Sequence, residues 1–230
     1  MNIITGETTE NIETTSLRTQ SNVQTKISKK VYIKVKRVID VILASIALIL
    51  LSPLFAIIAI AIKIDSKGPV FFAHKRIGKN GNIIKLYKFR SMVINAQELI
   101  KSFTPEQMRE YKENYKLTND PRITKVGKFL RKTSLDELPQ LINIINGDLS
   151  IIGPRPVVAD ELEKYGVNKD KFLSVTPGLT GYWAANGRSN TTYEQRMEME
   201  LYYIDNLSLK MDIKVFFKTI LSVLKKEGAI

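Results

Sequence analysis

The sequence contains no cysteine and a single histidine, His74. The absence of cysteine excludes disulfide bonds and thiolate metal centres, and one histidine cannot form a cluster of imidazole ligands. A catalytic triad of serine and histidine is disfavoured for the same reason. Any divalent metal must therefore be held by carboxylates, which points to Mg²⁺ or Mn²⁺.

Acidic residues are fewer than basic ones: 23 Asp and Glu stand against 35 Lys and Arg, giving a net charge of +12 in 230 residues. Such a charge implies an anionic partner, which could be a phospholipid, a nucleic acid or a phosphorylated substrate. In a chain that also has a membrane segment, anionic lipid is favoured first. The length suits one ordinary domain with appendages.

The membrane segment is an apolar run over residues 41–62 that contains no charged side chain. A run of about 22 residues is long enough for one helix to cross a bilayer. Pro53 at its centre cannot donate an N–H to the carbonyl of Ile49, so we expect the helix to kink or break there. Ser52 could return a hydrogen bond to the carbonyl that is freed. Each half then reaches only about mid-bilayer.

Basic residues flank this run on both sides, so the positive-inside rule places both ends on the cytoplasmic face. We therefore predict a re-entrant membrane hairpin, a helix–break–helix with its break at Ser52-Pro53. An ordinary signal-anchor helix with a tolerated proline is the alternative. The flanking residues are Lys29, Lys30, Lys34, Lys36 and Arg37 before the run and Lys63, Lys67, Lys75, Arg76 and Lys79 after it.

Three segments follow from this pattern: a disordered polar tail (1–30), the re-entrant membrane helix (31–64) and a small cytoplasmic domain (65–230). The predicted fold class is α/β and mainly helical. Residues 70–76 and 82–89 are predicted to form a short β-hairpin, since Asn80-Gly81 is a strong hairpin turn. Interfacial amphipathic helices are predicted over residues 123–132 and at the C-terminus. For the C-terminal helix, core packing is the alternative for the apolar face, which comprises Ile213, Phe216, Phe217, Ile220, Leu221 and Leu224.

Asp136 and Glu137 are adjacent carboxylates in front of a predicted helix. Asp136 could simply cap that helix, and on local evidence this explanation is the simpler one. Alternatively, the helix dipole keeps both carboxylates ionised, so that they could attack phosphorus or hold Mg²⁺. Arg155 lies between Pro154 and Pro156, which fix its backbone, and a guanidinium held in this way suits a diphosphate. A surface arginine in a turn is the alternative.

A second rigid turn is predicted over residues 176–183. Trp183 in this turn could stack on a base or a sugar, but an aromatic side chain at a membrane interface is the more frequent explanation. Lys88 and Arg90 flank Phe89 at the end of the second predicted strand and could form a solvated basic edge.

Taken together, the chain from Lys36 to the C-terminus resembles the bacterial sugar transferases, which are monotopic phosphoglycosyl transferases that start polysaccharide assembly on undecaprenyl phosphate. Several motifs in a fixed order are far more specific than any one of them. The motifs are Ser52-Pro53, Tyr87-Lys88-Phe89-Arg90-Ser91-Met92, Ser134-Leu135-Asp136-Glu137-Leu138-Pro139-Gln140, Gly147-Asp148-Leu149-Ser150 with Gly153-Pro154-Arg155-Pro156, and Thr176-Pro177-Gly178-Leu179-Thr180-Gly181.

The resemblance implies a catalytic domain on the cytoplasmic face of the bacterial inner membrane. It implies transfer of a sugar-1-phosphate from a UDP-sugar to undecaprenyl phosphate with release of UMP. This would be the first membrane step of exopolysaccharide, capsule or O-antigen-type glycan assembly. Asp136 would be the nucleophile and would form a covalent aspartyl sugar-phosphate, and Glu137, with Asp136, would hold Mg²⁺. The residues that would bind substrate are Lys88, Arg90, Arg131, Gly153, Pro154, Arg155, Pro156 and Arg188.

The chain departs from the family in two places. Large members carry several N-terminal membrane spans and an extra domain, whereas this chain has a polar tail. The segment 182–188 is similar to the hexose-transferring branch, in which Leu-Trp-Gln-Val-Ser-Gly-Arg is more usual. Galactose or glucose is therefore favoured, with an N-acetylhexosamine or a diacetamido sugar left open.

The implied partners are the UDP-sugar, undecaprenyl phosphate, inner-leaflet lipids and later glycosyltransferases of the pathway. No nucleic acid is expected, and a homodimer is left open. The rival hypothesis is a membrane-anchored basic adaptor that binds anionic lipid or nucleic acid without catalysis. Arg155 between its prolines and the Asp136-Glu137 pair favour the enzyme, because generic nucleic-acid binding explains neither.

Overall fold

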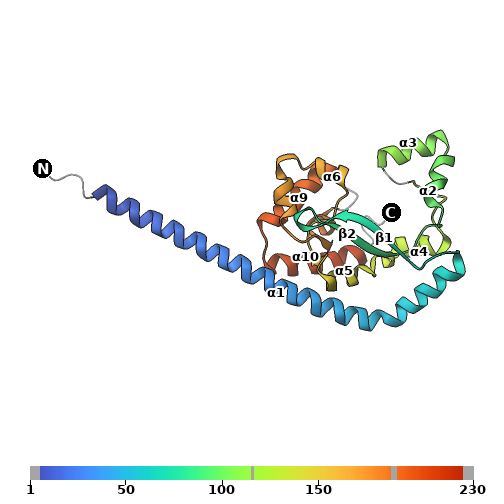
Figure 1. The fold of residues 1–230 in the computed structure, drawn as a ribbon, viewed down its shortest axis with the longest axis horizontal. Coiled ribbons are helices and arrows are strands. Elements are labelled where there is room, and N and C mark those ends of the chain that lie inside the picture. Colours follow the sequence, from blue (N-terminus) through green and yellow to red (C-terminus); the bar gives the residue numbers. More distant parts are fainter. Residues whose placement is uncertain (1–5, 115–116, 188–190, 225–230) are drawn as a thin grey trace.

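The computed structural model describes residues 6–114, 117–187 and 191–224. One long helix, α1 (Gly6–Asp65), passes beneath a body of short helices and two small sheets (Figure 1). The mainly helical α/β fold class is confirmed. Residues 6–28 are the N-terminal part of α1, and the predicted division of the chain into three segments stays a prediction.

Helix α1 is continuous through Pro53, so the predicted break at Ser52-Pro53 is wrong. The helix instead bends beneath the body (Figure 1). The hydroxyl of Ser52 donates to the carbonyl of Ile49 at 2.8 Å, which confirms the predicted compensating bond. This is the carbonyl that Pro53 cannot reach, and its satisfaction allows the helix to bend without opening.

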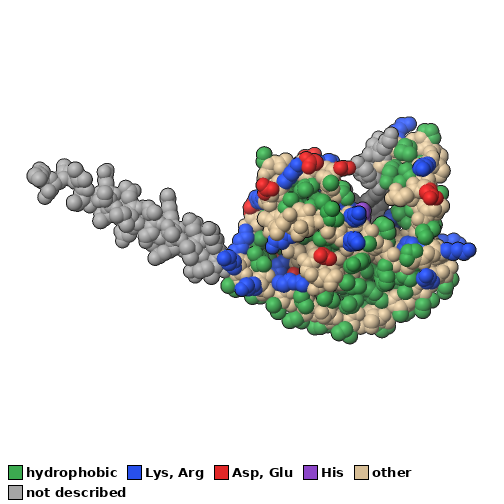
Figure 2. Space-filling view, viewed as in Figure 1, with side chains coloured by type: hydrophobic (Ala, Val, Ile, Leu, Met, Phe, Trp, Pro, Cys, Tyr) green, Lys and Arg blue, Asp and Glu red, His purple; other side chains and the backbone are tan. Residues whose placement is uncertain are grey.

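The central part of α1 presents a large apolar surface. The helical segment Lys29–Asp65 is long and apolar enough to cross a membrane, judged by length and composition. In Figure 2, hydrophobic side chains follow the lower edge along which α1 runs, with Lys and Arg side chains near both ends. A contiguous apolar surface of this extent is typical of a lipid-contacting face. Its most exposed members are Ile42, Ile46, Ile49, Leu50, Ile57 and Ile60.

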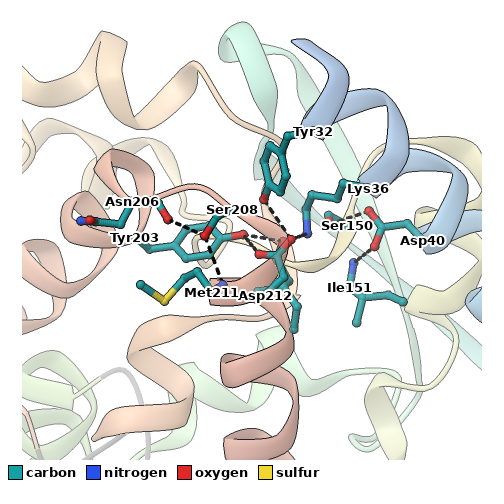
Figure 3. Close-up of polar contacts among 11 residues, drawn as sticks. Tyr32, Lys36, Asp40, Ser150, Ile151, Tyr203, Asn206, Ser208, Met211 and Asp212 are labelled. Carbon is teal, nitrogen blue, oxygen red and sulfur yellow. Dashed lines mark hydrogen bonds and ion pairs between the residues drawn. The ribbon is translucent and has the colours of Figure 1, made fainter. Parts of the chain in front are cut away.

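The two ends of this apolar run are fastened to the same body. Before the run, the carboxylate of Asp40 accepts a 2.7 Å hydrogen bond from the hydroxyl of Ser150 (Figure 3). After the run, the carboxylate of Asp65 accepts a 2.9 Å bond from the backbone N–H of Val126. Arg90 donates to backbone carbonyls at the same end of α1. Both ends of the apolar run are therefore attached to the same body, which lies on one side of α1 (Figure 1).

Asp212, in the first turn of α10 (Leu209–Leu224), joins α1 to the C-terminal part of the chain (Figure 3). Its carboxylate accepts bonds from Tyr32 at 2.9 Å, from Lys36 at 2.7 Å and from Tyr203 at 2.7 Å. Tyr203 lies on α9 (Tyr193–Asp205), and its hydroxyl also reaches the carbonyl of Ile152 at 3.3 Å. One buried carboxylate thus connects α1, α9, α10 and the strand that holds Ile152.

Strands β1 (Phe71–Ile77) and β2 (Ile83–Phe89) form the predicted antiparallel hairpin. At the turn, Asn80 and Gly81 have φ values of 57° and 80°, the left-handed conformation that the Asn-Gly pair adopts at low cost. The hairpin prediction is confirmed, with both strand starts shifted by one residue.

The second sheet pairs β3 (Ser150–Ile152) in parallel with β4 (Gly178–Thr180). The rigid turn predicted over residues 176–183 is therefore wrong in part, because its middle is a strand. A Cβ atom on Gly178 would lie 2.1 Å from the backbone nitrogen of Gly153, so only glycine permits this approach. The pairing brings the turn after β3 beside the loop after β4.

The remaining helices are short, and in Figure 1 α2 and α3 extend away from the sheets, whereas the others lie close to them. Helix α4 contains the predicted amphipathic segment: Phe129 is 59% exposed, while Leu130 is buried. The helices are α2 (Ala96–Leu99), α3 (Pro105–Asn114), α4 (Lys125–Thr133), α5 (Gln140–Asn146), α6 (Ala159–Glu163), α7 (Lys169–Leu173) and α8 (Tyr182–Asn186).

Helix α10 turns its apolar face outward, so the core-packing alternative is wrong for this face. Val215 and Asp212 on its inner side are buried. The side chain of Leu224 lies outside the described residues. An exposed apolar face beside lysines is typical of a helix lying on a membrane surface. The exposed residues are Ile213, Phe216, Phe217, Ile220 and Leu221.

Asn143 is fully buried on α5 and ties this helix to β2. Its amide oxygen accepts from the N–H of Tyr87 at 2.9 Å, and its amide nitrogen donates to the carbonyl of Lys85 at 2.8 Å. The amide nitrogen also donates to Asp148 at 3.0 Å. These bonds hold the helix and the strand that flank the acidic pair.

We predict that Asn143→Leu lowers the free energy of unfolding by about 2–4 kcal/mol, because it leaves buried backbone groups of β2 without partners. Thermal unfolding in detergent, followed by circular dichroism, measures the change. Asn146→Leu is the matched control, since Asn146 is exposed on the same helix. Equal melting temperatures for the two variants would contradict the assigned role of Asn143.

Candidate active site

Asp136 and Glu137 lie in a short 3₁₀ turn, η3 (Leu135–Glu137), between α4 and α5. Ser134 adopts a left-handed conformation, with φ of 57°, and turns the chain sharply between α4 and η3. Helix α5 begins at Gln140, so Asp136 is not its cap and the helix-cap interpretation is wrong. The Asp136 side chain is only 9% exposed.

Basic side chains from two neighbouring elements compensate this buried carboxylate. Burial raises the pKa of Asp136, as does the charge of Glu137, while the charges of Lys88 and Arg131 lower it. On β2, Lys88 forms an ion pair with Glu137, with 2.7 Å between Nζ and Oε1. On α4, Arg131 is held by a 2.9 Å bond from its Nε to the hydroxyl of Ser91. The structure thus brings together four of the predicted site residues.

A pocket opens beside this pair, and three of its lining residues are the bases Arg76, Lys88 and Arg155. Positive charge in a concave site suits a phosphate-bearing ligand. Arg155 follows β3, and its guanidinium carbon lies 5.8 Å from the centre of the Trp183 ring. The other lining residues are Leu86, Glu137, Gln140, Pro156, Gly178, Leu179, Thr180, Gly181, Trp183, Ala184 and Glu200.

Trp183 on α8 forms part of the pocket wall. Its indole nitrogen donates to the hydroxyl of Thr191 at 2.7 Å. The guanidinium carbon of Arg196 lies 4.9 Å from its ring centre. These contacts make Trp183 a pocket residue, and its place at a membrane interface stays a prediction.

Not all the predicted binding residues reach the pocket. Arg90 is buried and donates to the carbonyls of Ser66 at 2.8 Å, Ile62 at 3.4 Å and Lys67, so it anchors α1. Gly153 and Pro154 lie buried at the close approach of β3 and β4, whereas Pro156 lines the pocket. Arg188 lies outside the described residues.

Sequence reasoning missed several pocket residues, notably Glu200, Gln140 and Arg76. The sequence indicates Arg76 only as one of the cations that flank the membrane run. Arg196 and Glu200 are four residues apart on α9, a spacing typical of an ion pair on an exposed helix face. Both side chains are in fact buried, which no local pattern indicates.

Glu200 is the most buried acid in the pocket, at 1% exposure. Its Oε1 accepts a 3.0 Å bond from the backbone N–H of Arg155. Burial raises the pKa of Glu200 to about 7, although this N–H and the charges of Arg196 and Arg155 oppose the shift. Glu200 therefore holds the turn that carries Arg155.

A metal ion would depend on the acidic pair. Within residues 6–114, 117–187 and 191–224, no group of three or more His, Cys, Asp or Glu side chains could hold one. Mg²⁺ is commonly bound by one or two carboxylates together with substrate phosphates and water. The half-buried carboxylate of Glu137, beside Asp136, fits this mode when a diphosphate supplies further oxygens.

Comparison with known proteins gives a consistent result. The family model described as bacterial sugar transferase matches residues 31–226. The chain is 43% identical to an undecaprenyl-phosphate galactose phosphotransferase of Salmonella typhimurium, over 93% of this chain and 44% of that protein. It is 46% identical to the exopolysaccharide production protein ExoY of Rhizobium meliloti, over 84% of this chain and 87% of that protein.

A third relative is the UDP-glucose:undecaprenyl-phosphate glucose-1-phosphate transferase of Escherichia coli, at 40% identity over 80% of this chain and 39% of that protein. The chain thus spans less than half the length of the Salmonella and Escherichia relatives, and most of the length of ExoY.

We predict that Glu200 makes the protein less stable as the pH rises from about 4.5 to about 7. Folded Glu200 keeps its proton to about pH 7, whereas the unfolded chain releases it near 4.5, so unfolding releases a proton between these values. The stability lost over this window is about 3 kcal/mol. Melting curves of the wild type and Glu200→Gln across this range isolate the contribution, with the exposed Glu198→Gln as control. Parallel pH profiles for the wild type and Glu200→Gln would contradict the shift.

Proposed function

The chain belongs to the bacterial sugar transferase family, and we propose that it transfers a hexose-1-phosphate from a UDP-sugar to undecaprenyl phosphate with release of UMP. The observation that carries the proposal is the buried Asp136, set beside Lys88 and Glu137 at a pocket lined by arginines. The Salmonella and Escherichia relatives are named for transfer of galactose and of glucose, respectively, which supports a hexose.

In the first step, a carboxylate oxygen of Asp136 attacks the β-phosphorus of the sugar nucleotide. The bond from that phosphorus to the bridging oxygen breaks, and UMP leaves with the electron pair. The product is an aspartyl sugar-phosphate. A carboxylate is a competent nucleophile for such covalent phosphoryl chemistry.

In the second step, a phosphate oxygen of undecaprenyl phosphate attacks the same phosphorus and releases the Asp136 carboxylate. The lipid then carries a sugar diphosphate, and Asp136 is ready for another cycle. Both steps are displacements at phosphorus, for which an enzyme supplies mainly positioning and charge neutralisation.

The basic residues match this requirement. An anionic nucleophile that attacks an anionic diphosphate is repelled unless cations lie nearby. Lys88 and Arg131 favour the ionised form of Asp136, and Arg155 and Arg76 bring further positive charge to the pocket. Glu137, with Asp136, would hold Mg²⁺, which would supply additional neutralisation of the diphosphate when bound.

We place the protein on the cytoplasmic face of the bacterial inner membrane, with the apolar run of α1 as a re-entrant helix. Two observations support this topology. The same body holds Asp40 before the run and Asp65 after it, and basic residues flank both ends. The exposed apolar face of α10 provides a further membrane contact, so both substrates' phosphates meet at the membrane surface.

The name of ExoY also supports a place in exopolysaccharide production, as the first membrane step of glycan assembly. A basic adaptor without catalysis is less well supported. It explains the net charge, but it gives no reason for a buried, ionisable Asp136 beside an ion pair and a pocket.

We predict that Asp136→Asn abolishes turnover, with a loss of at least about a thousandfold, while the melting temperature stays close to that of the wild type. The wild type, incubated with Mg²⁺ and UDP-hexose but no lipid, should release UMP once per protein molecule. Mass spectrometry should then find a hexose-phosphate adduct on the peptide containing Asp136.

The control for this variant is Asp170→Asn, the same chemical change at an exposed position on α7. An adduct on another residue, or near-normal turnover by Asp136→Asn, would contradict the assigned nucleophile. Normal turnover that requires undecaprenyl phosphate and leaves no adduct would contradict the covalent step alone.

We predict that single cysteines placed before and after the apolar run react from the same side of the membrane. The chain has no cysteine of its own, so Val31→Cys and Pro69→Cys each give one reporter at an exposed site. A membrane-impermeant maleimide should label both in inverted vesicles and neither in intact spheroplasts. Labelling of the two variants from opposite sides would show a spanning helix.

A further inference from the structure

Glu200 has a second oxygen that the proposed reaction does not use. Oε1 accepts the N–H of Arg155, but Oε2 is buried and has no hydrogen-bond partner among the described residues. A buried acceptor without a partner costs about 1–3 kcal/mol. Native proteins rarely leave such an atom unsatisfied unless a ligand or a water meets it.

Arg196 is the nearest obvious partner for Oε2, and it is engaged elsewhere. Its guanidinium bonds Glu161 at 3.3 Å and stacks on the rings of Trp183 and Tyr193. Its Nε and Nη2 are also unpartnered, so neither lies within hydrogen-bonding distance of Oε2. The free oxygen is therefore not explained by an ion pair on α9.

Glu200 belongs to the wall of the pocket already described. Glu200 and Gly181 both line it, and a Cβ atom on Gly181 would come within 3.9 Å of Oε2. The space that a side chain at Gly181 would fill is taken by the backbone carbonyl of Gly153, so only glycine lets these two segments of the pocket wall approach so closely. Gln140 and Thr180 bring further hydrogen-bonding groups to the same pocket.

The pocket is chemically divided. Lys88, Arg155 and Arg76 suit the phosphates of a sugar nucleotide, whereas the Glu200 carboxylate, once it is ionised, would repel them. The group that meets Oε2 must therefore be neutral and must donate a hydrogen bond, as a sugar hydroxyl does. The hexose is bonded directly to the phosphorus that Asp136 would attack, and Glu137, the neighbour of Asp136, lines this same pocket.

We propose that Glu200 is a specificity-determining residue whose Oε2 accepts a hydrogen bond from a hydroxyl group of the donor's hexose ring. The inference rests on the proposed function and deepens it by assigning the part of the pocket that reads the sugar. Because Oε1 also fixes the backbone at Arg155, one side chain couples recognition of the sugar to the position of a phosphate-binding cation.

The test compares wild type, Glu200→Gln and the control Glu198→Gln by kcat/KM of UMP release. The donors are UDP-galactose, UDP-glucose and monodeoxy forms of the better one. All donors are assayed above about pH 8, where Glu200 is ionised. Glu200→Gln keeps an acceptor for the Arg155 N–H and removes the charge that strengthens the bond to the hydroxyl. We expect it to lose about tenfold or more with the better donor, while Glu198→Gln is unchanged.

With the wild type, kcat/KM for one monodeoxy donor should be about tenfold or more below that for the parent donor. With Glu200→Gln, kcat/KM should differ little between these two donors, since the two changes remove the same contact. An equal loss for every donor would mean that Glu200 only positions Arg155, and would overturn the inference. A matching loss in affinity for UMP as product inhibitor would place Oε2 against the nucleoside and overturn it as well.

Different results would contradict the proposed function and the role of Glu200. If the wild type released no UMP from any UDP-hexose, the proposed function would be wrong, and this inference with it. If the wild type is active but all its monodeoxy donors react equally well, only the inference fails. If Glu200→Gln does not fold, kcat/KM is measured for Glu200→Asp with the same donors. The shorter side chain of this variant withdraws the carboxylate from the pocket.

Discussion

Asp40 lies on α1 immediately before the apolar run, yet its carboxylate is 5% exposed and is held by β3. It accepts bonds from the hydroxyl of Ser150 at 2.7 Å and from the N–H of Ile151 at 3.1 Å. A buried carboxylate is stable only when it is paired in this way. Because β3 continues directly into the turn of Arg155, the membrane helix fixes one wall of the pocket.

The opposite wall depends on the other arm of the same helix. Arg90 follows β2 and donates to carbonyls at the end of α1, while Asp65 accepts the N–H of Val126 in the first turn of α4. These contacts fix β2 with Lys88 and α4 with Arg131, the two cations that act on Asp136. The two parts of α1 that flank the apolar run therefore hold opposite walls of one pocket. The geometry of the site depends on how this helix is placed.

Local signals in the sequence predict the parts of this structure that depend on near neighbours. The Asn80-Gly81 turn gives the hairpin, and Ser52 compensates Pro53 within one helical turn. The β3–β4 pairing and the burial of Glu200 depend on contacts between distant segments, so no short pattern reports them. The break predicted at Pro53 fails because a side-chain bond can replace the lost backbone bond and leave a bend.

The reactive pair has to satisfy two opposing requirements. Burial excludes water from Asp136 but raises its pKa, which disfavours the ionised form that the proposed attack on phosphorus requires. Cations favour the ionised form of Asp136 only if they stay close to it. Holding a flexible side chain in one place costs conformational entropy. Lys88 and Arg131 meet this condition because a strand and a helix carry them, and Glu137 and Ser91 orient their heads. Both elements are held by α1, so the proposed membrane anchoring and the proposed activation of Asp136 depend on one set of contacts.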